Sequence, residues 1–261
     1  AIITGSDQVW NPHIFDFDEM FFFPFETKAI KIGYSVSIGE SSLEDIHGYS
    51  KYAKDFPYVG LREKGAKEKV EAICGHSVVD TVDPVLLLTR EDWETFVDKS
   101  SPLAKEKYLL CYLIDKKPIK QNMAIAEQIA KERGLKIKYI WMHLEKESFR
   151  GNFINDASPV EFFNYMYHAS AVMTDGYHGT VFSTIFNKPM YSVINNRQST
   201  DSRIRDYLTL IGLESRIFYG DAPVIPKEEI DYTEVDPKIR SAADASKAFL
   251  QSAIDNERVV K

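Results

Sequence analysis

Short apolar runs alternate with longer helix-like segments along most of the chain. The apolar runs have the length of buried strands and lie at residues 1–5, 31–36, 58–61, 108–114, 136–141, 171–174 and 190–194. Strands that alternate with helices are typical of parallel sheets with helices on both faces. The pattern therefore predicts an α/β fold.

The predicted helices begin and end at local signals. Ser41 lies three residues before Glu44, and Ser158 lies three residues before Glu161, which is the spacing of a reciprocal capping box. Gly134 is expected to end the helix before it, because glycine readily adopts the left-handed backbone of a helix end. The helices are predicted at residues 41–54, 63–73, 91–97, 118–133, 159–168, 179–187, 201–211 and 237–253.

A polar break at residues 99–102 precedes a fresh apolar run and predicts a domain boundary. We expect a first domain at residues 1–103, a second at 104–232, and a terminal segment at 233–261 whose helix packs back on the body. The opening apolar run carries neither a methionine nor a leader, so an upstream portion is expected to be missing.

The composition is that of an ordinary globular protein, with 44% apolar and 27% charged residues. A net charge of −7 provides no bulk attraction for nucleic acid or an anionic membrane face, so an anionic ligand would need a local site. The longest apolar run, at 108–114, is far too short for a transmembrane segment, and Cys74 and Cys111 lack metal or disulfide spacing. These features predict a soluble protein of the reducing cytoplasm.

The polar turn after residues 171–174 carries the strongest chemical signal. In an open α/β sheet, ligands bind where a strand ends and the next helix presents unpaired amides to an anion. Gly176 and Gly179 would let a ligand approach the backbone, and His178 could move a proton near neutral pH. The alternative is a tight glycine turn with a capping or core histidine. The candidate residues are Asp175, Gly176, Tyr177, His178, Gly179 and Thr180.

Two further apolar runs, at 1–5 and 31–36, end in small polar residues that suit binding loops or an anion cradle. The alternative is that these polar groups only satisfy the backbone of a turn, with the tryptophan as a core plug. The candidates are Ser6, Asp7, Trp10 and Asn11 after the first run, and Ser35, Ser37 and Gly39 after the second.

Arginines supply local positive charge to this acidic chain. Arg62 follows the run at 58–61, and Arg197, Arg203 and Arg205 lie around a later strand-to-helix turn. A guanidinium fork suits a carboxylate or phosphate, whereas surface ion pairs and a solvated helix face are the alternatives.

Other signals are structural or negative. The aromatic residues between 15 and 25 are expected to anchor a long loop on the core and receive no catalytic role. Paired histidines, dinucleotide-binding glycines and a phosphate-binding loop motif are all missing from the sequence, so we predict neither a metal nor a cofactor.

Taken together, the segments resemble the polysaccharide pyruvyl transferase family over residues 1 to about 220. The resemblance implies two Rossmann-like domains with parallel sheets, similar to the glycosyltransferase B architecture, of which the first is incomplete. The matching segments, in family order, are G-S-D-Q-V-W-N at 5–11, Y-S-V-S-I-G at 34–39, L-R-E-K at 61–64, D-P-V-L-L at 83–87, T-D-G-Y-H-G-T at 174–180 and N-K-P at 187–189.

The resemblance further implies transfer of a pyruvyl group from phosphoenolpyruvate to hydroxyls of a cell-surface polysaccharide precursor, such as that of a bacterial capsule. It assigns proton transfer or phosphate contact to His178, and clamping of the donor's anionic groups to Arg62 and Arg203. The acceptor would be a sugar or a lipid-linked oligosaccharide, the latter requiring contact with the membrane face.

The chain departs from the family pattern at one position. Better-understood members of the family carry an arginine two residues before the histidine, where this chain has Gly176. The loss of this donor keeps two alternatives open: an enzyme that uses a nucleotide sugar, and a glycan-binding protein without catalysis.

Overall fold

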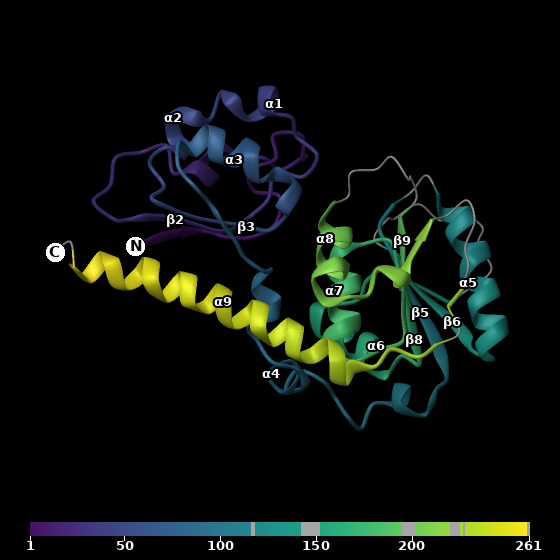
Figure 1. Ribbon diagram of the computed structural model, residues 1–261. Coiled ribbons are helices and arrows are strands. Elements are labelled where there is room, and N and C mark those ends of the chain that lie inside the picture. Colours follow the sequence, from purple (N-terminus) through teal and green to yellow (C-terminus); the bar gives the residue numbers. More distant parts are fainter. Residues whose placement is uncertain (116–117, 142–151, 195–201, 220–224, 227, 260–261) are drawn as a thin grey trace. The chain divides into compact units, whose positions relative to one another are not determined.

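A computed structural model describes residues 1–115, 118–141, 152–194, 202–219, 225–226 and 228–259. Arg197, one of the predicted arginines, lies outside the described residues. The chain forms two compact units, each with its own parallel sheet (Figure 1). The first unit comprises Ala1–Leu87, Thr200–Asp206 and Val235–Lys261, and the second comprises Leu88–Ser199 and Tyr207–Glu234.

The first unit is built on four parallel strands in the order β1-β2-β3-β4. The strands are β1 (Ile2–Thr4), β2 (Lys31–Val36), β3 (Tyr58–Leu61) and β4 (Val79–Asp80). The helices between them are α1 (Leu43–His47), α2 (Ser50–Ala53) and α3 (Lys67–Cys74). Because all four strands run the same way, their carboxyl ends meet at one edge of the sheet.

The core of the first unit is rich in aromatic residues. Trp10 is fully buried and stacks on Phe22, with 4.7 Å between ring centroids, while Phe56 meets it edge-on at 5.3 Å. Phe22 in turn stacks on Tyr49 at 5.2 Å. The aromatic segment therefore anchors its loop on the core, as predicted, and Trp10 is part of this core.

The second unit has a six-stranded parallel sheet in the order β10-β9-β8-β5-β6-β7. Numbered along the unit, this is the 3-2-1-4-5-6 order of the Rossmann fold, and the direction of winding reverses between β5 and β8. The strands are β5 (Tyr108–Leu113), β6 (Lys136–Trp141), β7 (Asn152–Ile154), β8 (Ala171–Thr174), β9 (Met190–Ile194) and β10 (Ile217–Tyr219). The two sheets confirm the predicted α/β class.

The helices of the second unit follow the predicted signals closely. Gly134 ends the long α5 with φ +64°, and the capping box of Ser158 and Glu161 begins α6. The helices are α4 (Arg90–Glu94), α5 (Ile119–Arg133), α6 (Pro159–His168), α7 (Tyr177–Ile185) and α8 (Ser202–Ile211), whose first turn belongs to the first unit.

Several predicted helix bounds were wrong. The segment at 41–54 forms two short helices, α1 and α2, and α3 begins at Lys67 instead of residue 63. The capping box of α1 is formed by Ser42 and Asp45, because the hydroxyl of Ser41 is already used to donate to Asn11 Oδ1 at 2.8 Å. Helix α7 begins at Tyr177, two residues earlier than predicted, with Gly176 as its extended N-cap. His178 therefore lies in the first helical turn instead of a loop.

The terminal helix α9 (Tyr232–Val259) is longer than predicted and continues through Pro237. It packs on the first unit, where Ser246 Oγ accepts from Val82 N at 3.0 Å. A Cβ atom on Gly60 would come within 3.1 Å of Phe249, so the absence of a side chain there allows close packing of α9 on β3. Among the described residues, no helix has the combined length and apolar content of a membrane span.

The buried tryptophan sets the stability of the first unit. We expect Trp10→Ala to lower the free energy of unfolding by about 3–5 kcal/mol, because it leaves a cavity among stacked rings. Phe15→Ala is the matched control, since the Phe15 side chain is fully exposed, and it should change little. Chemical denaturation followed by far-UV circular dichroism, which reports on the backbone, measures both variants. Equal losses of unfolding free energy in the two variants would contradict this account.

Candidate functional site

The most distinctive edge of the second unit lies at the carboxyl ends of β5 and β8, where the strand order reverses. Ligands of open α/β sheets bind at such reversal points. Strand β8 ends at Thr174, and α7 begins three residues later at Tyr177. The first amides of α7 have no partner within the helix and, with the helix dipole, favour a negatively charged ligand at this end.

Glycines bring the first turn of α7 close to the strands. A Cβ atom on Gly179 would lie 2.2 Å from Thr174 Oγ1 and 2.8 Å from the Tyr112 ring, both impossibly short. A Cβ atom on Gly176 would lie 2.4 Å from Ile114 Cδ1, so a side chain here would have to displace the end of that isoleucine. Gly179 is therefore required for packing of the helix on the sheet.

Asp175 ties the loops after β5 and β8 together. Its side chain accepts from the backbone amides of Ile114 at 2.7 Å and Asp115 at 3.3 Å, and from Asn122 Nδ2 at 3.2 Å. The residue is only 8% exposed, and burial, with a smaller effect of the nearby Asp115 charge, raises its pKa to about 6, although the hydrogen bonds from backbone amides act in the opposite direction. Asp175 thus shapes the loops and is not presented to a ligand.

His178 is the partly exposed residue of this turn. Its ring meets the buried Tyr177 ring edge-on, with 5.4 Å between centroids. Thr180 is fully buried, and its hydroxyl bonds to Gly176 O at 3.1 Å and to Ser192 Oγ at 2.8 Å. Of the residues predicted here, His178 is the side chain that a ligand could reach, while Tyr177 and Thr180 support the turn.

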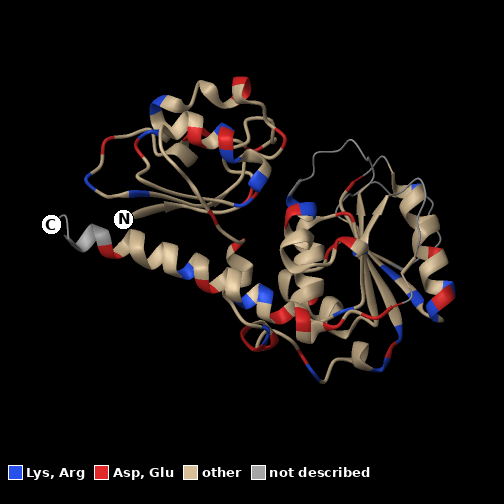
Figure 2. Ribbon diagram, viewed as in Figure 1, with Lys and Arg blue, Asp and Glu red and all other residues tan. Residues whose placement is uncertain are grey.

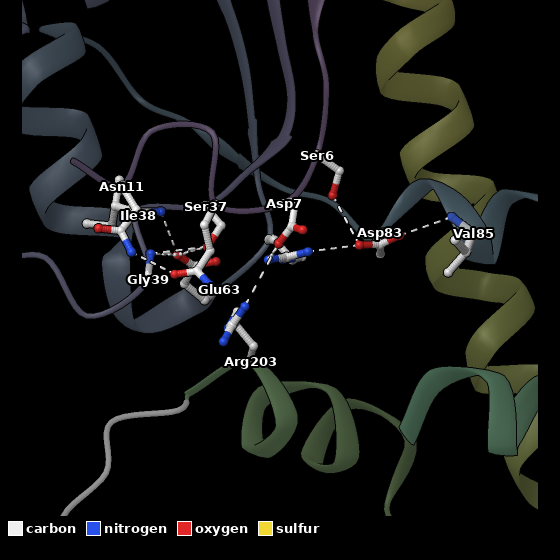
Figure 3. A network of polar contacts seen from close by, with 12 residues as sticks. Ser6, Asp7, Asn11, Ser37, Ile38, Gly39, Glu63, Asp83, Val85 and Arg203 are labelled. Carbon is white, nitrogen blue, oxygen red and sulfur yellow. Dashed lines mark hydrogen bonds and ion pairs between the residues drawn. The ribbon is translucent and has the colours of Figure 1, made fainter. Parts of the chain in front are cut away.

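Figure 3 shows the corresponding edge of the first unit, where each of the four strands contributes a polar group beyond its carboxyl end. Ser6 and Asp7 follow β1, and Ser37 follows β2. Arg62 and Glu63 follow β3, and Asp83 follows β4. The arrangement places residues from distant parts of the sequence in one network.

Arg62 lies at the centre of this network. Its side chain is 1% exposed and makes two ion pairs, from Nη1 to Asp83 Oδ2 at 2.9 Å and from Nη2 to Asp7 Oδ1 at 3.0 Å. Asp83 is itself buried and accepts from Ser6 Oγ at 3.1 Å and from the Val85 amide at 3.1 Å. A buried guanidinium and a buried carboxylate therefore neutralise each other at this edge.

Asp7 is the exposed member of the network. Its side chain is 60% exposed, and Arg203 Nη1, in the first turn of α8, lies 4.0 Å from its Oδ1. The backbone of Asp7 has φ +69°, in the left-handed region that most residues avoid, and it is held there by a parallel bridge to Val36. Figure 3 shows the side chains of Asp7 and Arg203 pointing toward one another.

Glu63 fills the predicted anion cradle. Its Oε1 accepts from Ser37 Oγ at 2.8 Å, from the Ile38 amide at 2.9 Å and from the Gly39 amide at 3.2 Å. Ser35 and Ser37 are both fully buried. Burial raises the pKa of Glu63. The Glu63 carboxylate therefore accepts hydrogen bonds from the backbone amides that the sequence predicted to be available to a ligand.

Asn11 organises its own turn. Its Oδ1 accepts from Ser41 Oγ at 2.8 Å and from the His13 amide at 3.0 Å, and its Nδ2 donates to Gln8 Oε1 at 2.6 Å. This is the structural role that we gave as the alternative for this segment.

Sequence reasoning missed Asp83, Glu63 and Asn122 as members of these edges. A buried arginine needs a carboxylate partner, so an acidic residue near the end of another strand was the available signal for Asp83. Glu63 and Asn122 had no such signal, because each sits in a helix-like segment. Among the described residues, no three histidine, cysteine or acidic side chains gather as a metal would require.

Several solved structures have a fold similar to that of this chain. The chain is similar to UDP-N-acetylglucosamine 2-epimerase from Rickettsia bellii, with a TM-score of 0.57 and 12% identity over 88% of this chain and 68% of that one. It is also similar to a chain of the accessory secretory protein 1,2 and 3 structure from Streptococcus pneumoniae, with a TM-score of 0.51 and 8% identity over 93% of this chain and 52% of that one. At these identities the likeness shows the fold alone.

A third match is the epimerase from Methanocaldococcus jannaschii, with a TM-score of 0.49 and 14% identity over 83% of this chain. The chain spans 63% of the length of that epimerase. No curated protein matches the chain.

The two structures with TM-scores above 0.5 and the two parallel sheets show an α/β fold that is similar to the glycosyltransferase B architecture. The sequence model of the polysaccharide pyruvyl transferase family matches residues 1–197. The chain belongs to that family, which confirms the resemblance seen in its motifs.

Arg62 should contribute strongly to the stability of the first unit. We expect Arg62→Leu to lower the free energy of unfolding by about 3–5 kcal/mol, because it leaves the Asp83 carboxylate buried without its cation. Adding Asp83→Asn should recover part of this loss. Urea denaturation of the single and double variants measures the coupling, and simple additivity of the two losses would argue against it.

The raised pKa of Asp175 makes stability depend on pH in a defined direction. A carboxyl whose folded pKa, about 6, exceeds its unfolded value of 3.8 favours folding below the unfolded value and loses that contribution as pH rises through 6. The free energy of unfolding of Asp175→Asn minus that of wild type should therefore rise by about 2–3 kcal/mol between pH 4 and pH 7, because only the wild type loses the contribution of this carboxyl. Urea denaturation across this range checks the sign; a constant difference would contradict it.

Proposed function

We propose that the protein transfers a pyruvyl group from phosphoenolpyruvate to hydroxyls of a polysaccharide or its precursor. The observation that carries the proposal is the family match together with His178 in the first turn of α7, at the point where the strand order reverses. The family supports a transferase, and the donor, the acceptor and ketal formation belong to the proposal.

The amino-terminal turn of α7 suits the anionic groups of the donor. Phosphoenolpyruvate carries a phosphate and a carboxylate, and unpaired helix amides bind such oxygens without a cationic side chain. Gly176 and Gly179 would allow these oxygens to approach the backbone. In this proposal the amides compensate for the family arginine that Gly176 replaces.

His178 would supply the proton that activates the donor. Protonation of C3 of phosphoenolpyruvate converts its methylene carbon into a methyl group. It leaves C2 electron-poor, so that a hydroxyl oxygen can attack it. Histidine is the side chain that most often serves as a general acid in enzymes. The partial exposure of His178 supports this role, since the donor must reach its ring.

The acceptor would be a sugar or a lipid-linked oligosaccharide, and the reaction would take place in the cytoplasm. A pyruvyl ketal bridges two oxygens, so the acceptor must carry two neighbouring hydroxyls. Acidic and basic residues are interspersed over both units (Figure 2). An acceptor would therefore be bound mainly through hydrogen bonds to its hydroxyls.

Release of inorganic phosphate from phosphoenolpyruvate tests the function. Wild type, incubated with phosphoenolpyruvate and a panel of methyl hexopyranosides, should release phosphate and form pyruvylated glycoside detectable by mass spectrometry. We expect His178→Ala to lower kcat by about 10²–10⁴-fold, because it removes the proton donor.

The matched control is His47→Ala, since His47 is exposed and belongs to the short α1 helix. It should keep wild-type activity. Thermal stabilisation by a UDP-sugar, without stabilisation or phosphate release by phosphoenolpyruvate, would overturn the proposal in favour of a nucleotide-sugar enzyme.

A further inference from the structure

We propose that the first unit carries a separate saccharide site, a hollow near the amino-terminal ends of its strands that binds sugars bearing a carboxylate. The hollow lies between the loop at residues 24–30, which leads into β2, and helix α2 with the turn that follows it. It has a volume of about 990 Å³ and is open to solvent. The site lies within a single unit, at the opposite end of the strands from Asp7, Arg62 and Asp83.

The loop that forms one wall of the hollow is held at both ends. At its start, Phe23 stacks on Phe56 with 5.8 Å between ring centroids, and its carbonyl accepts from the Phe25 amide at 2.7 Å. At its end, the Ile30 carbonyl accepts from the Ile2 amide at 2.9 Å, which joins the loop to β1. The hollow is therefore formed before a ligand binds, as is usual for small-molecule sites.

A buried ammonium group lines the hollow. The Lys31 side chain is only 7% exposed, and its Nζ donates to Asp55 Oδ2 at 3.1 Å. An ammonium group has three N–H donors, and in the part of the chain that the structure describes this is the only hydrogen bond of Lys31 Nζ. A buried charge with further donors favours a ligand that brings acceptor oxygens. A carboxylate is such a ligand.

The side chains that line the hollow include more ammonium groups than carboxylates. The ammonium groups are those of Lys28, Lys31 and Lys51, and the carboxylates are those of Glu26 and Asp55. Glu19, whose charge also acts on Lys51, does not line the hollow. In a chain with a net charge of −7, this local excess of one ammonium group suits a ligand with a single negative charge.

The remaining lining suits a sugar ring. Phe25 is 46% exposed and offers an aromatic face to the C–H groups of a ring. Lys51 Nζ lies 4.5 Å from the centroid of the half-buried Tyr52 ring, so positive charge and aromatic surface are close together. The exposed Glu26 carboxylate and Thr27 hydroxyl can accept hydrogen bonds from sugar hydroxyls. A saccharide with one carboxylate would use all of these groups.

The product of the proposed reaction has this chemistry. A pyruvyl ketal adds a methyl group and a free carboxylate to a sugar that keeps its other hydroxyls. The hollow would therefore bind saccharide that already carries the modification and hold it on the protein. The source of the ligand rests on the proposed function, whereas its class, a saccharide with a carboxylate, rests on the residues that line the hollow.

Titration of the full chain with two matched glycosides tests the site. One is a methyl hexopyranoside that carries a pyruvyl ketal, and the other is the methyl ester of the same compound, which lacks the charge. Binding is followed by NMR through the backbone amides of residues 25–31. We expect the acid to shift these amides with a Kd of about 1 mM, and the ester to bind at least about tenfold more weakly.

Substitutions of the lysines locate the binding. Lys31→Met removes the buried ammonium group but keeps an apolar stem, and it should weaken binding of the acid at least about tenfold. Lys28→Gln combined with Lys51→Gln should weaken it about threefold, because exposed charges contribute less. Lys54→Met is the matched control, since Lys54 is exposed, follows α2 and does not line the hollow. It should bind the acid as wild type does.

Three results overturn the proposal. The first is equal binding of the acid and the ester, and the second is binding of the acid without a shift of the amides at residues 25–31. The third is a Lys31→Met variant that has the Tm of wild type and binds the acid equally well. If Lys31→Met does not fold, unchanged binding by the Lys28→Gln, Lys51→Gln variant takes its place as the third result.

The two proposals fail in different ways. Wild type that releases phosphate and forms pyruvylated glycoside, but does not bind the acid in the hollow, overturns the saccharide site and leaves the proposed function intact. Wild type that binds the acid in the hollow, but releases no phosphate with any glycoside, overturns the proposed function and leaves a site for saccharides that bear a carboxylate.

Discussion

Every strand pair in the described sheets is parallel, and the placement of polar groups depends on this constraint. Parallel strands end at one edge, so residues that follow different strands become neighbours however far apart they lie in the sequence. In the first unit this brings Ser6, Asp7, Arg62 and Asp83 within hydrogen-bonding reach. In the second it brings the loop after β5 against Asp175.

Burial decides what each of these polar groups can do. Arg62, Glu63 and Asp175 lie almost entirely out of water, where an ionised group must be satisfied within the protein. They therefore hold loops and other side chains in position. Asp7 and His178 remain more exposed, and His178 is the residue to which the proposed function assigns chemistry. Whether a polar side chain holds the structure together or can meet a ligand therefore depends on its solvent exposure more than on its residue type.

The site could be predicted only in part. The strand ends that carry polar residues were recognisable, because apolar runs that stop at small polar residues mark the ligand edge of a parallel sheet. The partners were not, since the contact between Arg62 and Asp83 joins residues 21 positions apart through tertiary packing. For the same reason, a cradle of amides at Ile38 and Gly39 looked available, although Glu63 occupies it.

The sequence alone determined the α/β class, all of the described strands except β4, β7 and β10, and most helix ends. Apolar periodicity, capping boxes and glycine stops act over a few residues, so these features could be read locally. The early start of α7 and the shift of the α1 cap escaped it, since both depend on contacts with other elements. Tertiary structure decided which carboxylate faces which arginine and which remains in water, because long-range packing sets burial and sequence distance does not.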